Sequence, residues 1–341
     1  IAYYKGSAQS YIKFINSPKG FLPMGYGRVF ITGGAGFIGS HVVEKFLKEG
    51  SEVTILVEYN SNHNIDSLKH LSEEDRKKVK LVFGDVNSYS FLKNKIKDHD
   101  LVLHLASLIS IPYSYENPAA YFRTNVQGTC NVLQAAMDSN VKRVLHTSTS
   151  EVYGTPMSVP INEKFPLQGQ SPYSASKIGA DKVAESFFCS FGLPVTTIRP
   201  FNTYGPRQSM RAVIPSMIMQ ALYTGKINHG YLEPTRDFTF VKDMAEAFYQ
   251  IANSTNTYGE VLNVGTGTEV SMREVLKTVL EEAGRPVEVV QDPERMRPSK
   301  SEVMRLLADN NKVKELVGWE PKVPFNEGIR KTIEWFKNNK V

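Results

Sequence analysis

The chain has 341 residues, of which 41% are hydrophobic and 22% are charged. This length can form one large core or two smaller ones, at about 100 to 200 residues per domain. The 40 Lys and Arg residues exceed the 35 Asp and Glu residues by only five and form no basic cluster, so nucleic acid is not an expected partner. The longest apolar runs are far shorter than the roughly 20 residues that span a bilayer, so we expect no membrane contact.

The two cysteines, Cys130 and Cys189, are too few for a disulfide framework and lack the spacing of a zinc site. They fit a reducing compartment, and we expect both to be small buried apolar residues and no metal to be bound. Residues 1–24 contain three lysines, no acid and no continuous apolar stretch, so a secretory signal is not expected there. We treat these 24 residues as an extension of unclear role.

From Arg28 onward, short apolar segments alternate with amphipathic segments of helical spacing. The apolar segments predict strands at residues 28–32, 53–57, 79–83, 101–105, 144–147 and 195–198. The amphipathic segments predict helices at 37–49, 124–137 and 173–188. Strands that alternate with helices indicate a parallel sheet with crossover helices, and near-continuous apolar strands indicate burial on both faces of that sheet.

A glycine-rich turn, Thr32-Gly-Gly-Ala-Gly-Phe-Ile-Gly-Ser40, lies between the first strand and the first helix. In such a turn the first glycine permits a tight bend, the second lets the backbone approach a pyrophosphate, and the third lets the helix pack on the strand. The helix N-terminus adds free N–H groups and partial positive charge. The cofactor site predicted from this motif comprises Gly33, Gly36, Phe37, Ile38 and Gly39.

An acid about 20 residues after the turn is expected at the end of the second strand, where it would bind the adenosine ribose hydroxyls. Glu58 is the candidate, and it favours NAD. The polar segment 59–62 beside it is small enough to hold a 2′-phosphate, so NADP remains an alternative.

Residues at the ends of the third and fourth strands complete the predicted cofactor site. Asp85 and Val86 are placed to meet the adenine, although an acid at a strand end is more often a turn former. Leu105 and Ala106 follow the fourth strand, where the pyrophosphate and nicotinamide ribose would lie. We expect His104 to be a packed histidine rather than a catalytic base.

Beyond residue 199, prolines separate short elements, including a helix at 271–282 that a capping box of Ser271 and Glu274 opens and Gly284 ends. The fold class that we predict is α/β, a Rossmann-like doubly wound parallel sheet with a smaller C-terminal α/β lobe. Residues 25–199, with 238–265 returning to them, would form the dinucleotide-binding domain. Residues 200–237 and 266–341 would form the lobe.

Tyr173 and Lys177 are four residues apart in a predicted helix and therefore share one face. A nearby ammonium group favours phenolate over phenol, so we expect the pKa of Tyr173 to be lowered until it can accept a hydroxyl proton near neutral pH. The segment 147–154, after the preceding strand, adds hydroxyl groups that could orient a sugar alcohol. It also adds the carboxylate of Glu151, which could move a second proton.

Over residues 27–335 the chain resembles extended short-chain dehydrogenases/reductases of the nucleotide-sugar epimerase/dehydratase family. The motifs that carry the resemblance are the glycine turn, Asn125 in Thr124-Asn-Val-Gln-Gly128, the set Thr149, Tyr173 and Lys177, Pro200-Phe-Asn-Thr-Tyr-Gly-Pro-Arg207, Arg236-Asp-Phe238, Asn263-Val-Gly265, and Arg297-Pro298 with Ser301-Glu302.

The resemblance implies that Thr149, Tyr173 and Lys177 form a catalytic triad and that Asn125 belongs to the cofactor site. It implies a nucleotide sugar as substrate, held by Ser107, Asn202, Arg207, Arg236, Asn263, Arg297 and Glu302. Four of these residues, Asn202 and the three arginines, would hold the diphosphate and nucleoside. Arginine suits this task because its planar fork pairs with two phosphate oxygens at once.

Glu151 indicates which reaction the resemblance implies. A 4-epimerase needs only hydride removal and return at C4, whereas a 4,6-dehydratase must also take a proton from C5. The dTDP-glucose dehydratases have an aspartate where this chain has Ser150, so Glu151 would serve as both base and acid. The sequence Thr149-Ser150-Glu151 resembles GDP-mannose 4,6-dehydratases and also UDP-glucuronate decarboxylases.

Segments 107–115, 166–173 and 208–215 are most similar to the N-acetylhexosamine 4,6-dehydratases of legionaminic acid biosynthesis. The resemblance thus implies that UDP- or GDP-N-acetylglucosamine is converted to the 4-keto-6-deoxy sugar. A decarboxylase, a 4-epimerase and a redox-sensing binding protein without turnover are the alternatives. The family further implies a cytoplasmic homodimer, paired through the helices at 124–137 and 173–188.

Overall fold

The computed structural model describes residues 25–60, 65–295 and 303–339. The expectations for residues 1–24, for Arg297 and for Glu302 lie outside these ranges. Within them, no helix combines the length and the apolar character that crossing a membrane requires.

Seven strands form one parallel sheet in the order β10-β6-β5-β4-β1-β2-β3. Their bounds are β1 Arg28–Thr32, β2 Glu52–Glu58, β3 Val79–Gly84, β4 Leu101–His104, β5 Arg143–Thr147, β6 Val195–Pro200 and β10 Val261–Val264. The order reverses between β1 and β4, and ligands of such sheets bind at the carboxyl ends of the strands beside this point. The predicted Rossmann-like fold is confirmed.

Helices cover both faces of the sheet because successive strand residues point to opposite sides. On one face, Val29 and Ile31 of β1 pack into a core with α2 (Phe37–Lys48) and α10 (Val241–Ala252). On the other face, Phe30 packs into a core with α4 (Tyr89–Ile96), α7 (Gly128–Asp138) and α8 (Pro172–Phe191). The helices η1 (Asp66–His70) and α3 (Glu73–Lys78) connect β2 to β3.

The segment between β4 and β5 differs from the prediction of one helix at 124–137. Two short helices, α5 (Ile111–Glu116) and α6 (Pro118–Tyr121), precede a π-helical segment η2 (Phe122–Gln127), which continues into α7. A π-helical turn leaves no distinctive hydrophobic period, and such turns are frequent at functional sites. A short 3₁₀ helix, η3 (Ser150–Tyr153), follows β5.

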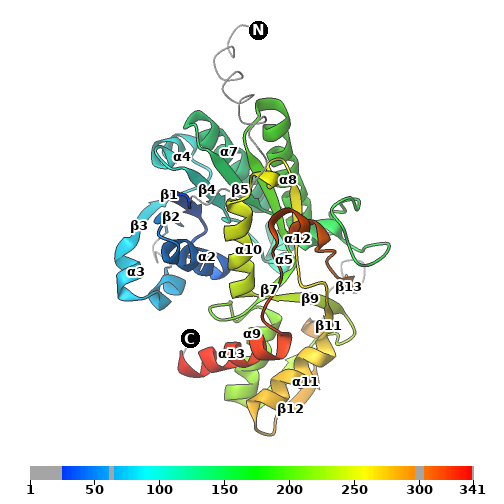
Figure 1. Cartoon of the computed structure of the whole chain (residues 1–341). Coiled ribbons are helices and arrows are strands. Elements are labelled where there is room, and N and C mark those ends of the chain that lie inside the picture. The colour runs from blue at the N-terminus through cyan, green and yellow to red at the C-terminus, as the bar shows by residue number, and fades with distance from the viewer. Residues whose placement is uncertain (1–24, 61–64, 296–302, 340–341) are drawn as a thin grey trace.

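The C-terminal lobe is built on a small mixed sheet in which β9 (Thr235–Phe240) pairs with β7 (Asn202–Tyr204), β11 (Glu269–Ser271) and β13 (Arg305–Leu306). A second ribbon pairs β8 (Lys226–His229) with β12 (Glu288–Gln291). The remaining elements are α9 (Val213–Met219), η4 (Gln220–Thr224), η5 (Thr255–Thr257), α11 (Met272–Ala283), η6 (Pro293–Arg295), α12 (Asn311–Val317) and α13 (Phe325–Asn338). Figure 1 shows α9, α11 and α13 together at one end of the molecule, away from the parallel sheet.

The structure confirms the predicted ends of helix α11 but not the predicted burial of the two cysteines. The predicted capping box at Ser271 and Glu274 opens α11, and Gly284 ends this helix in the left-handed conformation. Cys189, however, is exposed on α8 and Cys130 is only half-buried, so neither is the fully buried apolar residue that we expected.

The contact between the glycine turn and α2 leaves no room for a side chain at Gly39. An added Cβ would lie 2.1 Å from the carbonyl oxygen of Gly33, which is backbone and cannot rotate away. We predict that Gly39→Ala lowers the free energy of unfolding by about 1–3 kcal/mol, measured by urea denaturation. Gly27→Ala is the control because its Cβ would meet no atom closer than 3.6 Å. Equal stability of the two variants would contradict this close packing.

Candidate active site

The glycine turn and the residues after β4 form one surface at the carboxyl edge of the sheet. Gly33 has a φ of +72°, and a Cβ there would lie 2.7 Å from the amide nitrogen of Ala106. Thr32 joins the two segments, since its carbonyl accepts from the Leu105 N–H at 3.1 Å and its Oγ1 accepts from the Ala106 N–H at 3.2 Å.

The start of α2 fits an anionic group. Gly36 is the N-cap residue and provides no side-chain cap, so the first N–H groups of the helix, at Phe37 and Ile38, have no acceptor within the helix. Helix N-termini of this kind bind phosphates through their N–H groups and the helix dipole. The turn can therefore hold a dinucleotide pyrophosphate.

The acids at the neighbouring strand ends have different surroundings. Glu58 is exposed at the end of β2, the strand beside β1, so its carboxylate can reach a ribose on this edge. Asp85 accepts hydrogen bonds at 2.9 Å from the backbone N–H and from the side-chain amide of Asn87, which is the turn-forming role. Val86 is buried against α7.

His104 is a packed histidine, as we expected. Its Nδ1 lies 2.7 Å from Thr32 Oγ1 and its Nε2 lies 2.9 Å from Thr129 Oγ1. Burial holds the pKa of His104 well below its usual range, and the electrostatic interactions with His146 and Lys177 act in the same direction. The ring is thus neutral and turned away from proton transfer with a substrate.

Asn125 anchors the loop after β4. Its Oδ1 accepts from the Ser107 hydroxyl and the Leu108 N–H, both at 2.9 Å. Its Nδ2 donates to the Leu108 carbonyl at 3.0 Å and to Ser176 Oγ at 2.9 Å. This side chain is 1% exposed and its polar atoms are occupied, so it positions η2 against the loop after β4. Its place in the cofactor site stays a prediction.

Tyr173 and Lys177 lie on the buried face of α8, whose first turn is capped by Ser171. The Lys177 Nζ donates to the carbonyl oxygen of Thr147, at the end of β5, at 2.6 Å. Burial lowers the pKa of Lys177 to about 8, and the negative charge of Asp181 opposes this effect. The lysine is a cation at neutral pH and loses its charge in mildly alkaline solution.

The pKa of Tyr173 departs from our expectation. Burial raises the pKa of Tyr173 above its usual value, a hydrogen bond with the Thr149 side chain lowers it, and the charge of Glu151 raises it. The prediction that the neighbouring cation dominates was wrong for the protein without cofactor, because the sequence shows the cation but not the depth of burial. These interactions place Thr149, Glu151 and Tyr173 together.

Glu151 occupies η3 directly after β5, where its backbone N–H donates to Thr149 Oγ1 at 3.2 Å. Its side chain is half-buried and borders a small cavity with Ile111, Gln170 and Val303. The carboxylate makes no hydrogen bond or ion pair with residues 25–60, 65–295 or 303–339. The neighbouring Ser150 is 3% exposed, so of the two side chains only Glu151 is open to a ligand.

Arg207 is held by the cofactor-binding helix. Its guanidinium pairs with Glu44 of α2 at 2.9 Å and lies 3.4 Å from Ser40 Oγ. The backbone at Arg207 has a φ of +68°, a conformation that non-glycine residues rarely adopt. Its Nε is buried and has no hydrogen-bond partner among the described residues, so the expected pairing with a substrate diphosphate stays a prediction.

The other described candidates for substrate binding, Asn263, Arg236 and Asn202, differ in their hydrogen-bond partners. Asn263 is fully buried, accepts from the Tyr153 hydroxyl at 2.7 Å and donates to the Ile161 carbonyl at 2.9 Å. These contacts support a loop, and its expected contact with substrate stays a prediction. Arg236 is buried on β9 and donates to the Thr235 carbonyl at 2.9 Å. Asn202 begins β7, and its buried Oδ1 has no hydrogen-bond partner among the described residues.

Two buried aspartates were not recognised from the sequence. Asp237 accepts from the N–H groups of Thr266, Gly267 and Ala308 at 2.7, 2.9 and 3.2 Å, and so joins three segments of the lobe. Asp181 lies one helical turn after Lys177 on the same face of α8. That spacing was a usable signal for Asp181, whereas nothing in the sequence around Asp237 indicates its partners.

Residues 30–332 match the family model described as GDP-mannose 4,6 dehydratase. The chain belongs to this family. It is one branch of the extended short-chain dehydrogenases/reductases, which include nucleotide-sugar 4,6-dehydratases and epimerases.

Relatives in this family catalyse different reactions. The chain is 34% identical to the UDP-glucose 4-epimerase of Mycolicibacterium smegmatis, over 91% of this chain and 99% of the relative. It is 32% identical to the UDP-N-acetyl-alpha-D-glucosaminuronate decarboxylase of Bacillus cytotoxicus, over 91% and 98%. DesIV, a dTDP-glucose 4,6-dehydratase of Streptomyces venezuelae, is solved with NAD bound. Its structure superposes on this chain with a TM-score of 0.81 and 30% sequence identity, and the match covers 92% of this chain and 98% of DesIV.

The anchoring role of Asn125 can be tested by stability. Asn125→Ala would leave several buried polar groups of the Ser107–Leu108 loop without partners, and we predict a loss of about 2–4 kcal/mol in the free energy of unfolding. Gln127→Ala is the matched control, because Gln127 is exposed on the same π-helical segment and contacts only Asn131 among the hydrogen bonds described. A loss no larger than that of the control, in urea denaturation, would refute the role.

Proposed function

We propose that this protein is an NAD-dependent nucleotide-sugar 4,6-dehydratase that converts UDP- or GDP-N-acetylglucosamine to the 4-keto-6-deoxy sugar. One observation carries the proposal: the Glu151 carboxylate lies beside Tyr173, borders a cavity and has no partner in the described part of the chain. A simple 4-epimerase has no use for such a base, since it removes no proton from C5.

The cofactor part of the proposal is supported by the glycine turn, the open start of α2 and the exposed Glu58. Related structures are solved with NAD bound, among them that of DesIV. When bound, NAD would take a hydride from C4 of the sugar and return it to C6. The carboxylate at Glu58 favours NAD over NADP because it would repel a 2′-phosphate.

In the oxidation step, Tyr173 accepts the proton of the C4 hydroxyl, and Thr149 orients both groups through its hydroxyl. Lys177 holds a positive charge beside the phenol and stabilises the phenolate as it forms. The positive charge of an oxidised nicotinamide ring would add to this effect and offset the burial that raises the pKa of Tyr173 in the protein alone.

In the elimination step, Glu151 removes the C5 proton, which the adjacent C4 ketone has made acidic. The hydroxyl group then leaves from C6 as water after it takes a proton from the protonated Glu151. Ser150 stands where other dehydratases have an acid, but it is buried, so the carboxyl group of Glu151 performs both transfers. The stored hydride then returns to C6 and a proton from solvent is added to C5. Tyr173 releases the proton of the C4 hydroxyl to solvent, so the tyrosine, Glu151 and the cofactor all end in their starting states.

The choice of an N-acetylhexosamine is supported by the segments that border Glu151. Ile111 and Gln170 line the cavity beside Glu151 and come from two segments that resemble N-acetylhexosamine dehydratases. Arg236 and Asn202, in the lobe, remain the proposed contacts for the diphosphate and nucleoside. A homodimer paired through η2, α7 and α8 and a cytoplasmic location are further parts of the proposal.

The proposal predicts a specific isotope pattern. With UDP- or GDP-N-acetylglucosamine in deuterated water, the product should lose one water and carry one deuterium at C5, because solvent supplies that proton. Mass spectrometry and proton NMR measure both changes. Unchanged mass without deuterium for both sugars, together with release of carbon dioxide from UDP-glucuronate, would favour the decarboxylase instead.

The role of Glu151 can be tested separately. Glu151→Gln should still oxidise C4, seen as absorbance of reduced cofactor at 340 nm, but should lower the rate of elimination about 10²- to 10⁴-fold, since the amide cannot take the C5 proton. Glu116→Gln, at the exposed end of α5, is the control and should keep full activity. Undiminished product formation by Glu151→Gln would remove Glu151 from the mechanism.

A further inference from the structure

Asp181 continues the face of α8 that carries the proposed acid–base pair. Tyr173, Lys177 and Asp181 are spaced by four residues, and all three side chains are buried. Residues at this spacing lie one above another on a helix. Asp181 is therefore the acid of α8 that lies one turn from the ammonium group of Lys177, on the side away from Tyr173.

Two buried residues of the sheet hold Asp181 in place. Its Oδ2 pairs with Arg199 of β6, at 3.1 Å from Nε and 3.0 Å from Nη2. Its Oδ1 lies 3.1 Å from His146 Nε2 of β5. The Arg199 and Asp181 side chains are only 5% and 4% exposed, so water screens their charges little.

The charges of this cluster are not balanced without Asp181. Lys177 and Arg199 are cations, and burial lowers the pKa of His146, so this ring is neutral at pH 7. The only described hydrogen bond of Lys177 is to a neutral carbonyl. A buried ammonium group without a nearby negative charge loses its proton readily, and a neutral amine would no longer stabilise a phenolate.

Other titratable groups around Lys177 do not replace Asp181. His104 of β4 and His146 of β5 are both neutral because burial lowers their pKa values. The charge of Glu151 in η3 raises the pKa of Tyr173. Burial also raises the pKa of Tyr173, so its phenol is neutral and supplies no negative charge. Among the groups that act on Lys177, Asp181 is thus the negative one.

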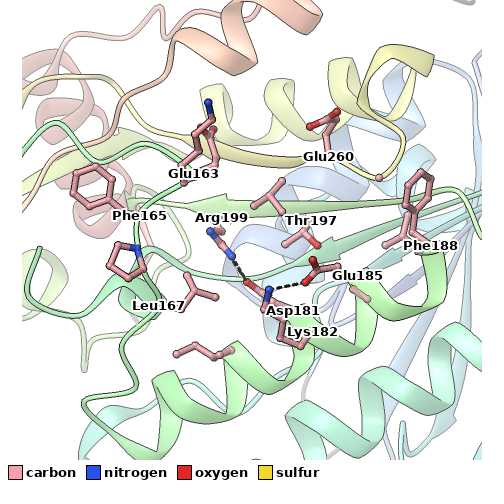
Figure 2. A pocket seen from close by; sticks show the side chains of 17 residues that line it. Glu163, Phe165, Leu167, Asp181, Lys182, Glu185, Phe188, Thr197, Arg199 and Glu260 are labelled. Atoms are coloured by element: carbon pink, nitrogen blue, oxygen red, sulfur yellow. Dashed lines mark hydrogen bonds and ion pairs between the residues drawn. The ribbon is translucent and has the colours of Figure 1, made fainter. Parts of the chain in front are cut away.

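The far side of the ion pair faces a cavity of about 500 Å³ between α8, β6 and the loop at 163–167. Figure 2 shows Asp181 joined to Arg199 at the wall of this cavity, with the carboxylates of Glu163, Glu185 and Glu260 around it. Lys164 and Lys182 also line it. Glu185 follows Asp181 by one turn but is exposed and paired with Lys182, so solvent screens its charge.

We propose that Asp181 is a positioning residue: it is the buried counter-ion that keeps Lys177 protonated for catalysis, and Arg199 limits how much of its charge reaches Lys177. The proposal rests on Tyr173 and Lys177 acting as the acid–base pair, but it does not depend on whether the reaction is dehydration, epimerisation or decarboxylation.

The test is a titration of Lys177 in the full-length protein without substrate. Lysine is labelled with ¹³C at Cε, and the Lys177 resonance is assigned by its loss in Lys177→Met. In the wild type it should titrate near pH 8, below the usual lysine pKa of about 10.4. Asp181→Asn should lower this midpoint by about one pH unit, the scale expected for one charge at this range in a dry site.

Arg199→Met breaks the same ion pair but removes the opposite charge, so it should raise the Lys177 midpoint. Opposite shifts separate an electrostatic role from a structural one, because loss of the pair is common to both variants. Arg199→Lys should restore the wild-type midpoint, and Glu185→Gln, the same substitution type one turn further along α8, should leave it unchanged.

Equal midpoints in wild type and Asp181→Asn, or shifts of Asp181→Asn and Arg199→Met in the same direction, would overturn the proposal. If Asp181→Asn does not fold, the comparison of Arg199→Met with Arg199→Lys decides. The titration needs no substrate, so a protein that fails to dehydrate sugars can still show these shifts. Conversely, if the protein is an active dehydratase but the Lys177 midpoint is the same in all variants, only the proposal for Asp181 is contradicted.

Discussion

The arrangement depends on the burial of an ammonium group at the carboxyl edge of a parallel sheet. Lys177 reaches the last carbonyl of β5 from the inner face of α8, and this contact fixes where Tyr173 and the Thr149–Glu151 segment meet. The low dielectric of the site makes each charge there act strongly on its neighbours. Burial itself disfavours the charged form of each group, so it lowers the pKa of Lys177 and raises that of Tyr173.

The same scaffold serves epimerases, decarboxylases and dehydratases among the relatives of this chain. In the proposed mechanism the glycine turn, Tyr173 and Lys177 serve the oxidation at C4, which all three reactions would share. What distinguishes them is the side chain that faces C5 and C6 of the sugar. In this chain the segment after β5 offers a carboxylate at Glu151 that has no partner among the described residues, and a buried hydroxyl at Ser150.

Features that depend on neighbouring residues in the chain were predictable from the sequence. The strands, the turn before α2 and the capping box of α11 follow from hydrophobic period, glycine placement and local hydrogen bonding. The proximity of Tyr173 and Lys177 follows from helical spacing. The grouping of Glu151 with them follows from its place after a neighbouring strand.

Features that depend on contacts between distant segments were not predictable. The pairing of Arg207 with Glu44 joins residues that are 163 positions apart in the chain, and no local pattern indicates it. The four contacts of Asn125 and the complete burial of Asn263 arise in the same way. Burial depth also reverses the expected pKa change of Tyr173, because a sequence shows which charges are near but not how much water remains around them.

The most direct measurement of the central claim follows the hydride itself. The protein is incubated with UDP- or GDP-N-acetylglucosamine carrying deuterium at C4, and the product is analysed by NMR. A 4,6-dehydratase delivers that deuterium to C6 of the 4-keto-6-deoxy sugar, which is the result we predict. Deuterium that returns to C4 in an epimerised or unchanged sugar would contradict the account.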